Sequence, residues 1–281
     1  MPVALAWELL HLAMLIHDDI IDSDLIRYGV NNIAGSYREI YQATNSVIDQ
    51  QERLATGAAL LAGDLALSAV HELILSCNLP TPMKLQAHRY LTNTIIDVVG
   101  GQLLDMEAPL YALPQADPML IARFKTASYS FVGPLMTGAL LAGASDADCA
   151  AMKRLGEVLG CGFQLQDDLL GVFGHASITG KSIKRDLSEG KCTYLMQQTF
   201  ALAAPGDVDV LQALVGKEDL TDTEADTVRE IIVRCGAKKQ TQDLVRTYAD
   251  QARAVADGLR ITPEYRQQIY NLIALTTERA R

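Results

Sequence analysis

The chain alternates long apolar stretches with short polar breaks, and the apolar positions recur at helical spacing. Breaks rich in glycine, asparagine or proline separate the stretches, among them Arg27–Ser36, Asn78–Pro82, Pro114–Pro118 and Pro205-Gly206. No segment shows the two-residue alternation of a β-strand. The pattern predicts helices over Val3–Ile26, Tyr37–Ser76, Met83–Leu110, Leu120–Ala142, Ala147–Val172, Thr193–Ala203, Val208–Leu214, Asp222–Cys235, Lys238–Leu259 and from Thr262-Pro263-Glu264 onward. It therefore predicts one all-α domain, a helical bundle spanning residues 1–281.

Two acidic clusters follow the most apolar of these segments. His17-Asp18-Asp19-Ile20-Ile21-Asp22 follows Ala4–Ile16, and Gln164-Leu165-Gln166-Asp167-Asp168 ends the segment that begins at Leu155. In a helix, Asp18 and Asp22 lie one turn apart on the same face, where their like charges repel. A solvated helix end explains either cluster alone, but two clusters of this kind favour bound cations. Carboxylates suit magnesium, which keeps several waters and is completed by substrate phosphates.

Basic residues lie near both clusters. Arg27 follows the first, Lys125-Thr126 precedes the second, and Lys181 and Lys191 lie in the polar segment after it. Each alone reads as a surface charge, but with the acidic clusters they describe a cavity for a polyanion such as a diphosphate. The sequence contains no Walker loop and no dinucleotide-binding fingerprint. For His17, a structural hydrogen bond is as well supported as a chemical role.

Composition and charge narrow the class of protein. The net charge of −10 argues against a nucleic-acid surface, and 49% apolar residues with only nine prolines suit close helix packing. The cysteines form no metal-ligand spacing and read as reduced thiols of a cytoplasmic protein. The first residues do not resemble a signal peptide. Thr126–Ser145 carries no charge, but Gly133-Pro134 favours a buried, kinked helix, so no transmembrane segment is expected.

In their order along the chain, these motifs resemble the trans-isoprenyl diphosphate (polyprenyl) synthases, in particular bacterial geranylgeranyl and polyprenyl diphosphate synthases. The resemblance covers nearly the whole chain. A lone DDxxD is a weak signal, whereas the ordered set is specific. It comprises Leu10-His11 through Asp22, Ala62-Gly63-Asp64, Gly101-Gln102 with Asp105, Lys125-Thr126, Phe163 through Asp168, and Thr179-Gly180-Lys181 with Asp186 and Gly190-Lys191.

The resemblance implies an isoprenoid-synthase bundle around a central cavity, commonly as a homodimer. It implies three magnesium ions that hold an allylic prenyl diphosphate, whose cation then adds isopentenyl diphosphate and loses a proton. Asp18, Asp22 and Asp167 would bind metal, supported by Asp19 and Asp168. Arg27, Lys125 and Lys181 would hold the allylic diphosphate, Gln102 and Gln164 would line the cavity, and Lys191 would also bind substrate. Ala13 and Met14, which precede Asp18, would set chain length and leave room for products of C20 or longer.

The sequence departs from the family pattern at three places. Gly171 stands where many members have the last aspartate of the second motif, although a bacterial subset resembles this chain there. Tyr28 replaces the second of two arginines, the one that would serve isopentenyl diphosphate. The Gly-Gly-Lys-x-x-Arg-like segment that precedes the first motif in the family has no counterpart here, so the family's N-terminal helices are expected to be missing.

These departures leave three hypotheses. The first is a chain-elongating prenyltransferase. The second is a class I terpene-synthase-like enzyme that ionises the allylic diphosphate without isopentenyl diphosphate, which the missing acceptor cations favour. The third is a non-catalytic subunit of a heteromeric synthase, against which the intact metal motifs argue. Overall similarity favours the first.

Overall fold

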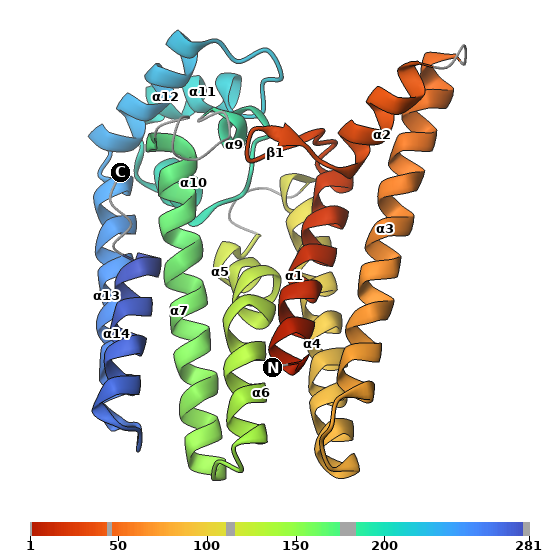
Figure 1. Cartoon of the computed structure of the whole chain (residues 1–281). Helices are drawn as coiled ribbons and strands as arrows, with labels where there is room; N and C mark the ends of the chain where they lie inside the picture. The colour runs from red at the N-terminus through yellow and green to blue at the C-terminus, as the bar shows by residue number, and fades with distance from the viewer. Residues whose placement is uncertain (1, 44–46, 111–115, 175–183, 278–281) are drawn as a thin grey trace. The chain divides into compact units, whose positions relative to one another are not determined.

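The computed structural model describes residues 2–43, 47–110, 116–174 and 184–277 (Figure 1). The chain divides into two compact units, Met1–Leu91 and Thr92–Arg281. Apart from one short hairpin, the regular structure of the described residues is helical, which confirms the all-α prediction. The single domain spanning 1–281 stays a prediction.

The first unit is built on two long helices. It contains α1 (Pro2–Ile21), β1 (Ile26–Arg27), β2 (Val30–Asn31), α2 (Ile33–Gln42), α3 (Ile48–Ser76) and the beginning of α4 (Thr81–Glu107). Both α1 and α2 pack along α3, with Ile16, Ala34 and Ala59 buried where they meet (Figure 1). The expected helix over Val3–Ile26 is too long, because Ser23 adopts a positive φ of 55° that a right-handed helix cannot accommodate.

A two-residue hairpin follows α1, so the prediction of a loop over Arg27–Ser36 is wrong in part. The strands pair Ile26 with Asn31 and Arg27 with Val30, which leaves Tyr28 and Gly29 as the turn. Both have positive φ, 53° and 79°, as in the mirror-image turns that fit the twist of a hairpin. Asn32 then caps α2, because its side-chain Oδ1 accepts from the Gly35 backbone amide at 2.9 Å. The side-chain Nδ2 of Asn32 donates to the Asp24 backbone carbonyl at 2.7 Å. These bonds fix the hairpin against the end of α1.

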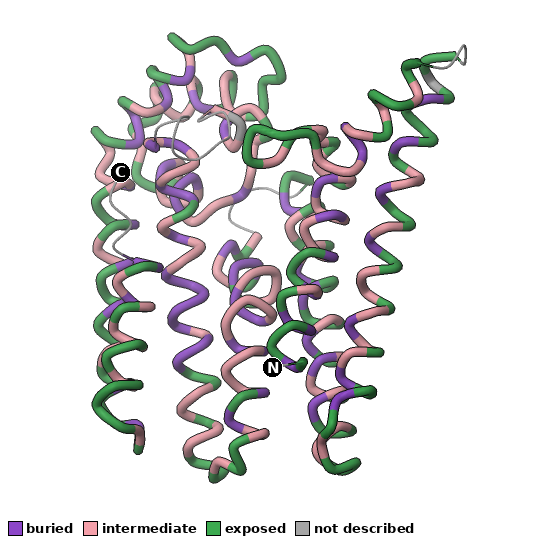
Figure 2. The backbone as a smooth tube through the Cα atoms, viewed as in Figure 1, coloured by how far each residue is buried: buried purple, intermediate pink, exposed green. Residues whose placement is uncertain are grey.

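The second unit is organised around α7, which is buried along much of its length (Figure 2). The helices η2, α6, α10, α13 and α14 all pack against it. The elements after the first part of α4 are η1 (Ala108–Leu110), α5 (Pro118–Ile121), η2 (Ala122–Val132), α6 (Gly133–Leu141), α7 (Asp146–Phe173), α9 (Arg185–Ser188), α10 (Tyr194–Leu202), α11 (Pro205–Leu214), α12 (Asp222–Arg234), α13 (Ala237–Gly258) and α14 (Pro263–Thr277).

Local signals placed most of these helix ends correctly. The sequence offered Ser145 and Asp146 as alternative caps of α7. Ser145 is the cap, because its hydroxyl accepts from the Asp148 amide at 3.2 Å. Thr221 and Glu224 form a capping box at the start of α12. The break predicted at Pro205-Gly206 lies just before it, at Ala203 and Ala204, because Pro205 is the first residue of α11, where its missing N–H costs nothing.

Glycines let η2 approach α7 closely. A side chain at Gly156 would meet the Cα of Val132 at 2.7 Å, and one at Gly160 would meet the Cβ of Ala127 at 2.3 Å. The η2 segment is a π-helix, a rare conformation that is frequent at functional sites. It carries Lys125 and Thr126, so the close packing on α7 holds these two side chains in place.

One described helix is long and apolar enough to cross a membrane by length and composition alone. This segment, Gln50–Ser76 in α3, has a mean hydropathy of 1.6. One such helix is weak evidence of a membrane span, because core helices of water-soluble proteins pass the same test, and α3 packs against α1 and α2. The apolar segment Thr126–Ser145 is divided between η2 and α6 at Gly133.

Candidate active site

The first acidic cluster lies at the C-terminal end of α1. Although α1 ends at Ile21, the Asp22 amide donates to the Asp18 carbonyl at 2.9 Å, so one further turn is completed. Asp18 and Asp22 are therefore one turn apart, and both are half-buried. A helix C-terminus carries partial negative charge, and the last turn of α1 contains no basic residue. The negative charge of these carboxylates is therefore best balanced by a cation from another element or by a bound metal ion.

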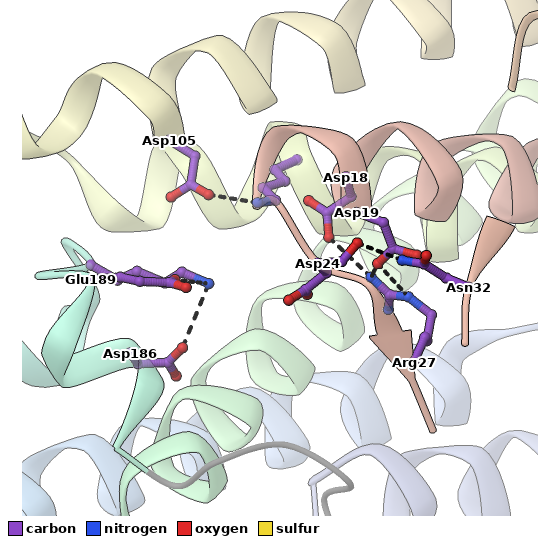
Figure 3. A network of polar contacts seen from close by, with 10 residues as sticks. Asp18, Asp19, Asp24, Arg27, Asn32, Asp105, Asp186 and Glu189 are labelled. Atoms are coloured by element: carbon purple, nitrogen blue, oxygen red, sulfur yellow. Dashed lines mark hydrogen bonds and ion pairs between the residues drawn. The ribbon is translucent and has the colours of Figure 1, made fainter. Parts of the chain in front are cut away.

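Arg27 of β1 supplies one such cation. Its Nε donates to Oδ1 of Asp19 at 2.8 Å and its Nη2 to the same oxygen at 2.5 Å (Figure 3). The same Nη2 lies 3.5 Å from Oδ2 of Asp18. Asp19 is only 5% exposed, so the guanidinium compensates a carboxylate that has lost most of its water. The hairpin thus brings Arg27 to the cluster to which the sequence assigned it.

His17, beside Asp18, fits into a notch on α3. A side chain at Gly63 would lie 2.2 Å from the His17 Nε2, so the imidazole occupies the space that this glycine leaves. The same nitrogen lies 3.6 Å from Oδ1 of Asp64. The Ala62-Gly63-Asp64 motif therefore receives His17, which supports a structural role for this histidine.

The two residues assigned to chain length lie one turn before the first cluster. Ala13 is completely buried, on the same stripe of α1 as Leu10 and Ile16. Met14 is half-buried and lies one turn before Asp18 on the same helix face. A larger side chain at Ala13 would therefore meet neighbouring groups, whereas Met14 keeps part of its surface exposed.

The second acidic cluster lines a cavity of about 90 Å³ within the second unit. The space is sufficient for several water molecules. Carboxylates, two lysines and a buried thiol surround it, contributed by α4, α5, η2, α7, α9 and the residues before α10. The lining residues are Asp105, Pro118, Ile121, Ala122, Lys125, Thr126, Gln164, Asp167, Asp168, Asp186, Lys191, Cys192 and Thr193.

Lys125 is held from two sides. Its Nζ donates to Oδ2 of Asp105 at 2.5 Å, and Asp105 is labelled in Figure 3. A side chain at Gly101 would lie 2.2 Å from the backbone nitrogen of Lys125, so α4 touches the η2 backbone directly. Gly101 and Asp105 are one turn apart on α4. The motif Gly101-Gln102 with Asp105 therefore positions Lys125.

A chain of hydrogen bonds leads to Asp168. The Thr126 hydroxyl donates to Oε1 of Gln164 at 2.6 Å, and Nε2 of Gln164 donates to Oδ1 of Asp168 at 2.8 Å. Burial raises the pKa of the Asp168 carboxyl well above its usual range. The charges of Asp186, Asp167 and Asp105 raise this pKa further, whereas the Gln164 amide lowers it. The pocket therefore stores unfavourable negative charge, which a bound cation would relieve.

Lys191 lines the same cavity and pairs with two carboxylates. Its Nζ lies 3.5 Å from Oδ1 of Asp186 and 3.1 Å from Oε2 of Glu189, both labelled in Figure 3. Burial and the charge of Asp105 raise the pKa of the Cys192 thiol, so this thiol stays protonated at neutral pH. The described cysteines are all free, as predicted.

The structure brings together most of the predicted residues within each unit. Asp18, Asp19, Asp22 and Arg27 form the first cluster, and the second cavity gathers Lys125, Gln164, Asp167, Asp168 and Lys191. Gln102 is half-buried on α4 but is not among the residues that line the cavity. Lys181 lies outside the described residues.

Sequence reasoning gave no role to Asp105, Asp186 or Cys192. Asp105 had a usable signal, because it lies one turn after Gly101-Gln102 on a predicted helix. Asp186 also had a signal, because it lies in the ordered motif between Lys181 and Lys191. Cys192 had no signal, since a single apolar thiol reads as core.

The residues around the second cavity fit a hydrated magnesium ion. In the described ranges, no three His, Cys, Asp or Glu side chains form a ready-made metal cage. Magnesium does not require one, because it commonly binds one or two carboxylates and completes its shell with water and phosphate oxygens. Exposed Asp167 beside buried, charge-crowded Asp168 offers this donor chemistry.

Residues 1–232 match the family described as polyprenyl synthetase. A geranylgeranyl diphosphate synthase of Methanosarcina mazei is 29% identical over 264 residues, which are 94% of this chain and 74% of the relative. A (2E,6E)-farnesyl diphosphate synthase of Mycobacterium bovis is 30% identical over 254 residues, 89% of this chain and 65% of that protein. The crystal structure of a Corynebacterium glutamicum geranylgeranyl pyrophosphate synthase, complexed with isoprenyl diphosphate and magnesium, superposes with a TM-score of 0.92. It is 31% identical and covers 99% of this chain and 79% of its own. This likeness confirms the predicted isoprenoid-synthase fold.

Asp168 makes the stability of the metal-free protein depend on pH. A carboxyl whose pKa is higher in the folded than in the unfolded chain binds more protons when folded. Its contribution to stability is therefore lost as pH rises from the usual value near 3.8 toward the raised value. In EDTA, Asp168→Asn should raise the free energy of unfolding at pH 7 by about 1–3 kcal/mol, measured by urea denaturation. The gain should shrink at acid pH.

Asp209→Asn is the control, because this carboxylate of α11 is exposed and does not line the cavity, so its removal should change the free energy of unfolding little. If wild type and Asp168→Asn have the same free energy of unfolding across the pH range, the inference that the buried Asp168 charge destabilises the protein is wrong.

Proposed function

Because the chain belongs to the polyprenyl synthetase family, we propose that it joins an allylic prenyl diphosphate to isopentenyl diphosphate. Breaking the C1–O bond of the allylic substrate gives an allylic cation and diphosphate. The double bond of isopentenyl diphosphate then attacks C1, and a proton is lost to the departing diphosphate. The lysines and carboxylates that surround one cavity carry this proposal, because they match the needs of a diphosphate with bound cations.

The roles of the residues follow from their places in the two clusters. Asp18, Asp22 and Asp167 bind magnesium, three ions in all, and buried Asp19 and Asp168 support them. Magnesium supplies Lewis-acid stabilisation of the charge that develops on the leaving diphosphate. The relative from Corynebacterium glutamicum, complexed with isoprenyl diphosphate and magnesium, supports this assignment.

The basic residues hold the diphosphate. Arg27, Lys125, Lys181 and Lys191 donate charge-assisted hydrogen bonds to phosphate oxygens, while Gln102 and Gln164 contact the substrate beside them. Of these, Arg27, Lys125 and Lys191 are ion-paired with carboxylates in the ligand-free protein. With magnesium bound to the carboxylates, these cations would be available to the phosphate oxygens. The proposal includes a homodimeric, cytoplasmic enzyme, as is common in the family.

Removing one metal ligand tests the reaction. Asp18→Asn or Asp167→Asn should lower the rate of pyrophosphate release from geranyl or farnesyl diphosphate by roughly 10²–10⁴-fold. This is the size expected when electrostatic stabilisation of the transition state is lost. Asp243→Asn, an exposed aspartate of α13, is the control and should keep the wild-type rate. Full activity of either cluster variant, or of the wild type in excess EDTA, would refute the assignment.

Product length is the second testable part of the proposal, and we assign C20 or longer. In the family the growing chain runs beside the helix of the first motif and an aromatic residue stops it, and small Ala13 and flexible Met14 would obstruct it less. Ala13→Phe should shorten the products, identified by chromatography after dephosphorylation. Because Ala13 is buried, Ala13→Phe could also shorten the products by disturbing the core. Met14→Phe is the second variant, and shorter products from it as well would indicate a filled channel and not a disturbed core. A wild-type enzyme that makes only C15, with Ala13→Phe unchanged, would contradict the assignment.

A second candidate function follows from Tyr28. This side chain lies at the hairpin turn, is 77% exposed, and brings no positive charge to a place where isopentenyl diphosphate would need one. An enzyme with a weak acceptor site would ionise the allylic diphosphate and release alcohol or cyclic products, as class I terpene synthases do.

Substitution at the turn distinguishes the two functions. Tyr28→Arg should lower the KM for isopentenyl diphosphate if a cation at this position serves the acceptor. Tyr28→Asn is the matched control, because asparagine suits the positive φ but adds no charge. The assay supplies farnesyl diphosphate and magnesium, with and without isopentenyl diphosphate. Efficient wild-type elongation at micromolar acceptor would exclude the second candidate, and pyrophosphate release with alcohol or cyclic products would favour it.

A further inference from the structure

Two histidines meet between α3 and α4 and belong to neither acidic cluster. The Nδ1 of His71 and the Nε2 of His88 are 3.0 Å apart. The ring centroids are 4.9 Å apart and the ring planes are tilted by 52°, so the rings are not stacked. Both residues lie within the first unit, His88 in the part of α4 that precedes Leu91. One ring nitrogen from each helix therefore faces the other across a short gap.

The backbone on both sides of this gap is well packed. Val70 and Ala87, the residues that precede the two histidines, are 0% and 1% exposed. A second contact joins the same two helices, because the Nζ of Lys84 donates to the Leu75 carbonyl at 3.0 Å. The two rings are thus held in place by their helices and not only by their mutual contact.

The separation of the two nitrogens suits two ligands of one metal ion. Imidazole nitrogens bind such an ion at about 2.0–2.1 Å, so two of them lie about 2.9 Å apart at a right angle and about 3.4 Å apart at the tetrahedral angle. The observed 3.0 Å is closer to the right angle. Right angles are typical of Ni²⁺ and Cu²⁺ in square-planar or tetragonal sites, whereas zinc prefers the tetrahedral angle.

The rings are also in the right state to bind a cation. Burial lowers the pKa of His71, and the charge of His88 lowers it further, so the His71 ring is neutral at neutral pH and keeps a lone pair. Both side chains are half-buried, so water reaches them. In the ligand-free protein one of the two nitrogens donates its hydrogen to the other. Metal binding requires that this hydrogen moves to the second nitrogen of the same ring, with no change in net charge of the pair.

We propose that His71 and His88 form a binding site for a transition-metal ion such as Ni²⁺ or Cu²⁺, which ties the end of α3 to the beginning of α4. Water molecules complete the shell of the ion, because no third His, Cys, Asp or Glu of the described residues joins the two rings. The site is independent of the proposed function, since imidazole selects these metals and magnesium selects oxygen ligands. The competing explanation is that the two rings only share a hydrogen bond.

Variants that keep a hydrogen bond but remove a metal ligand separate these explanations. The amide of Asn replaces the polar group at Nδ1, and the amide of Gln replaces the one at Nε2, so His71→Asn and His88→Gln still offer a hydrogen bond between α3 and α4. Loss of a group that only supports a metal ligand already costs roughly 10–100-fold in affinity. Each variant should therefore bind Ni²⁺ at least about tenfold more weakly than the wild type.

The affinity is measured by calorimetric titration of Ni²⁺ into the full chain, with magnesium in excess to occupy the carboxylate clusters. Ni²⁺ should also raise the Tm of the wild type, but not that of the double variant His71→Asn/His88→Gln. The matched control is His11→Gln, which removes an exposed histidine of α1 and should bind Ni²⁺ like the wild type.

A spectroscopic measurement on the wild type makes the test independent of whether the variants fold. Electron paramagnetic resonance of the protein with less than one equivalent of Cu²⁺ should show hyperfine coupling to two imidazole nitrogens. A spectrum with one coupled nitrogen, or with none, overturns the proposal. So does the absence of Ni²⁺ binding by the wild type, wild-type affinity in either His71→Asn or His88→Gln, or an equal loss of affinity in His11→Gln.

Discussion

Repulsion between crowded carboxylates is the constraint on which the rest of this structure depends. In the first unit, Asp18, Asp19 and Asp22 lie at a helix C-terminus, where the backbone dipole is also negative. In the second unit, four aspartates line one small cavity, and Asp168 among them is buried. In both units a cation from another element reduces the repulsion. Arg27 does so for Asp19, Lys125 for Asp105 and Lys191 for Asp186.

These ion pairs connect stability with ligand binding. Each holds a cation close to the carboxylates that the proposed reaction requires, so the ligand-free protein is already partly neutralised. Magnesium and diphosphate would replace these pairs with metal–carboxylate and cation–phosphate contacts, and the magnesium ions would bring the positive charge that the crowded carboxylates lack. The ion pairs do not remove all of the repulsion, because the pKa of Asp168 is still raised by burial and by its acidic neighbours.

Glycines determine where the functional groups lie. Gly63 leaves space for the His17 ring, Gly101 lets α4 touch the backbone at Lys125, and Gly171 leaves space for Asp186. Gly160 does the same between α7 and η2. At all four positions a Cβ would come within 2.5 Å of another group, so the absent side chain sets the distance between elements. In the sequence Gly63 and Gly101 belong to the ordered motifs and Gly171 departs from the family pattern, but nothing there indicates which group fills the space beside each of them.

The sequence by itself determined the features that depend on near neighbours along the chain. Apolar spacing gave the helices, Ser145 gave the start of α7, and the i, i+4 spacing put Asp18 and Asp22 on one face, because all of these involve residues within about one helical turn. Its ordered motifs also indicated the family. Only the tertiary structure decided that Arg27 returns to Asp19 through a two-residue hairpin, that Lys125 pairs with Asp105, and that Asp186 fills the space over Gly171. These contacts join residues from different elements, and their distances depend on how closely the helices pack and on which side chains are absent between them, which spacing along the chain does not specify.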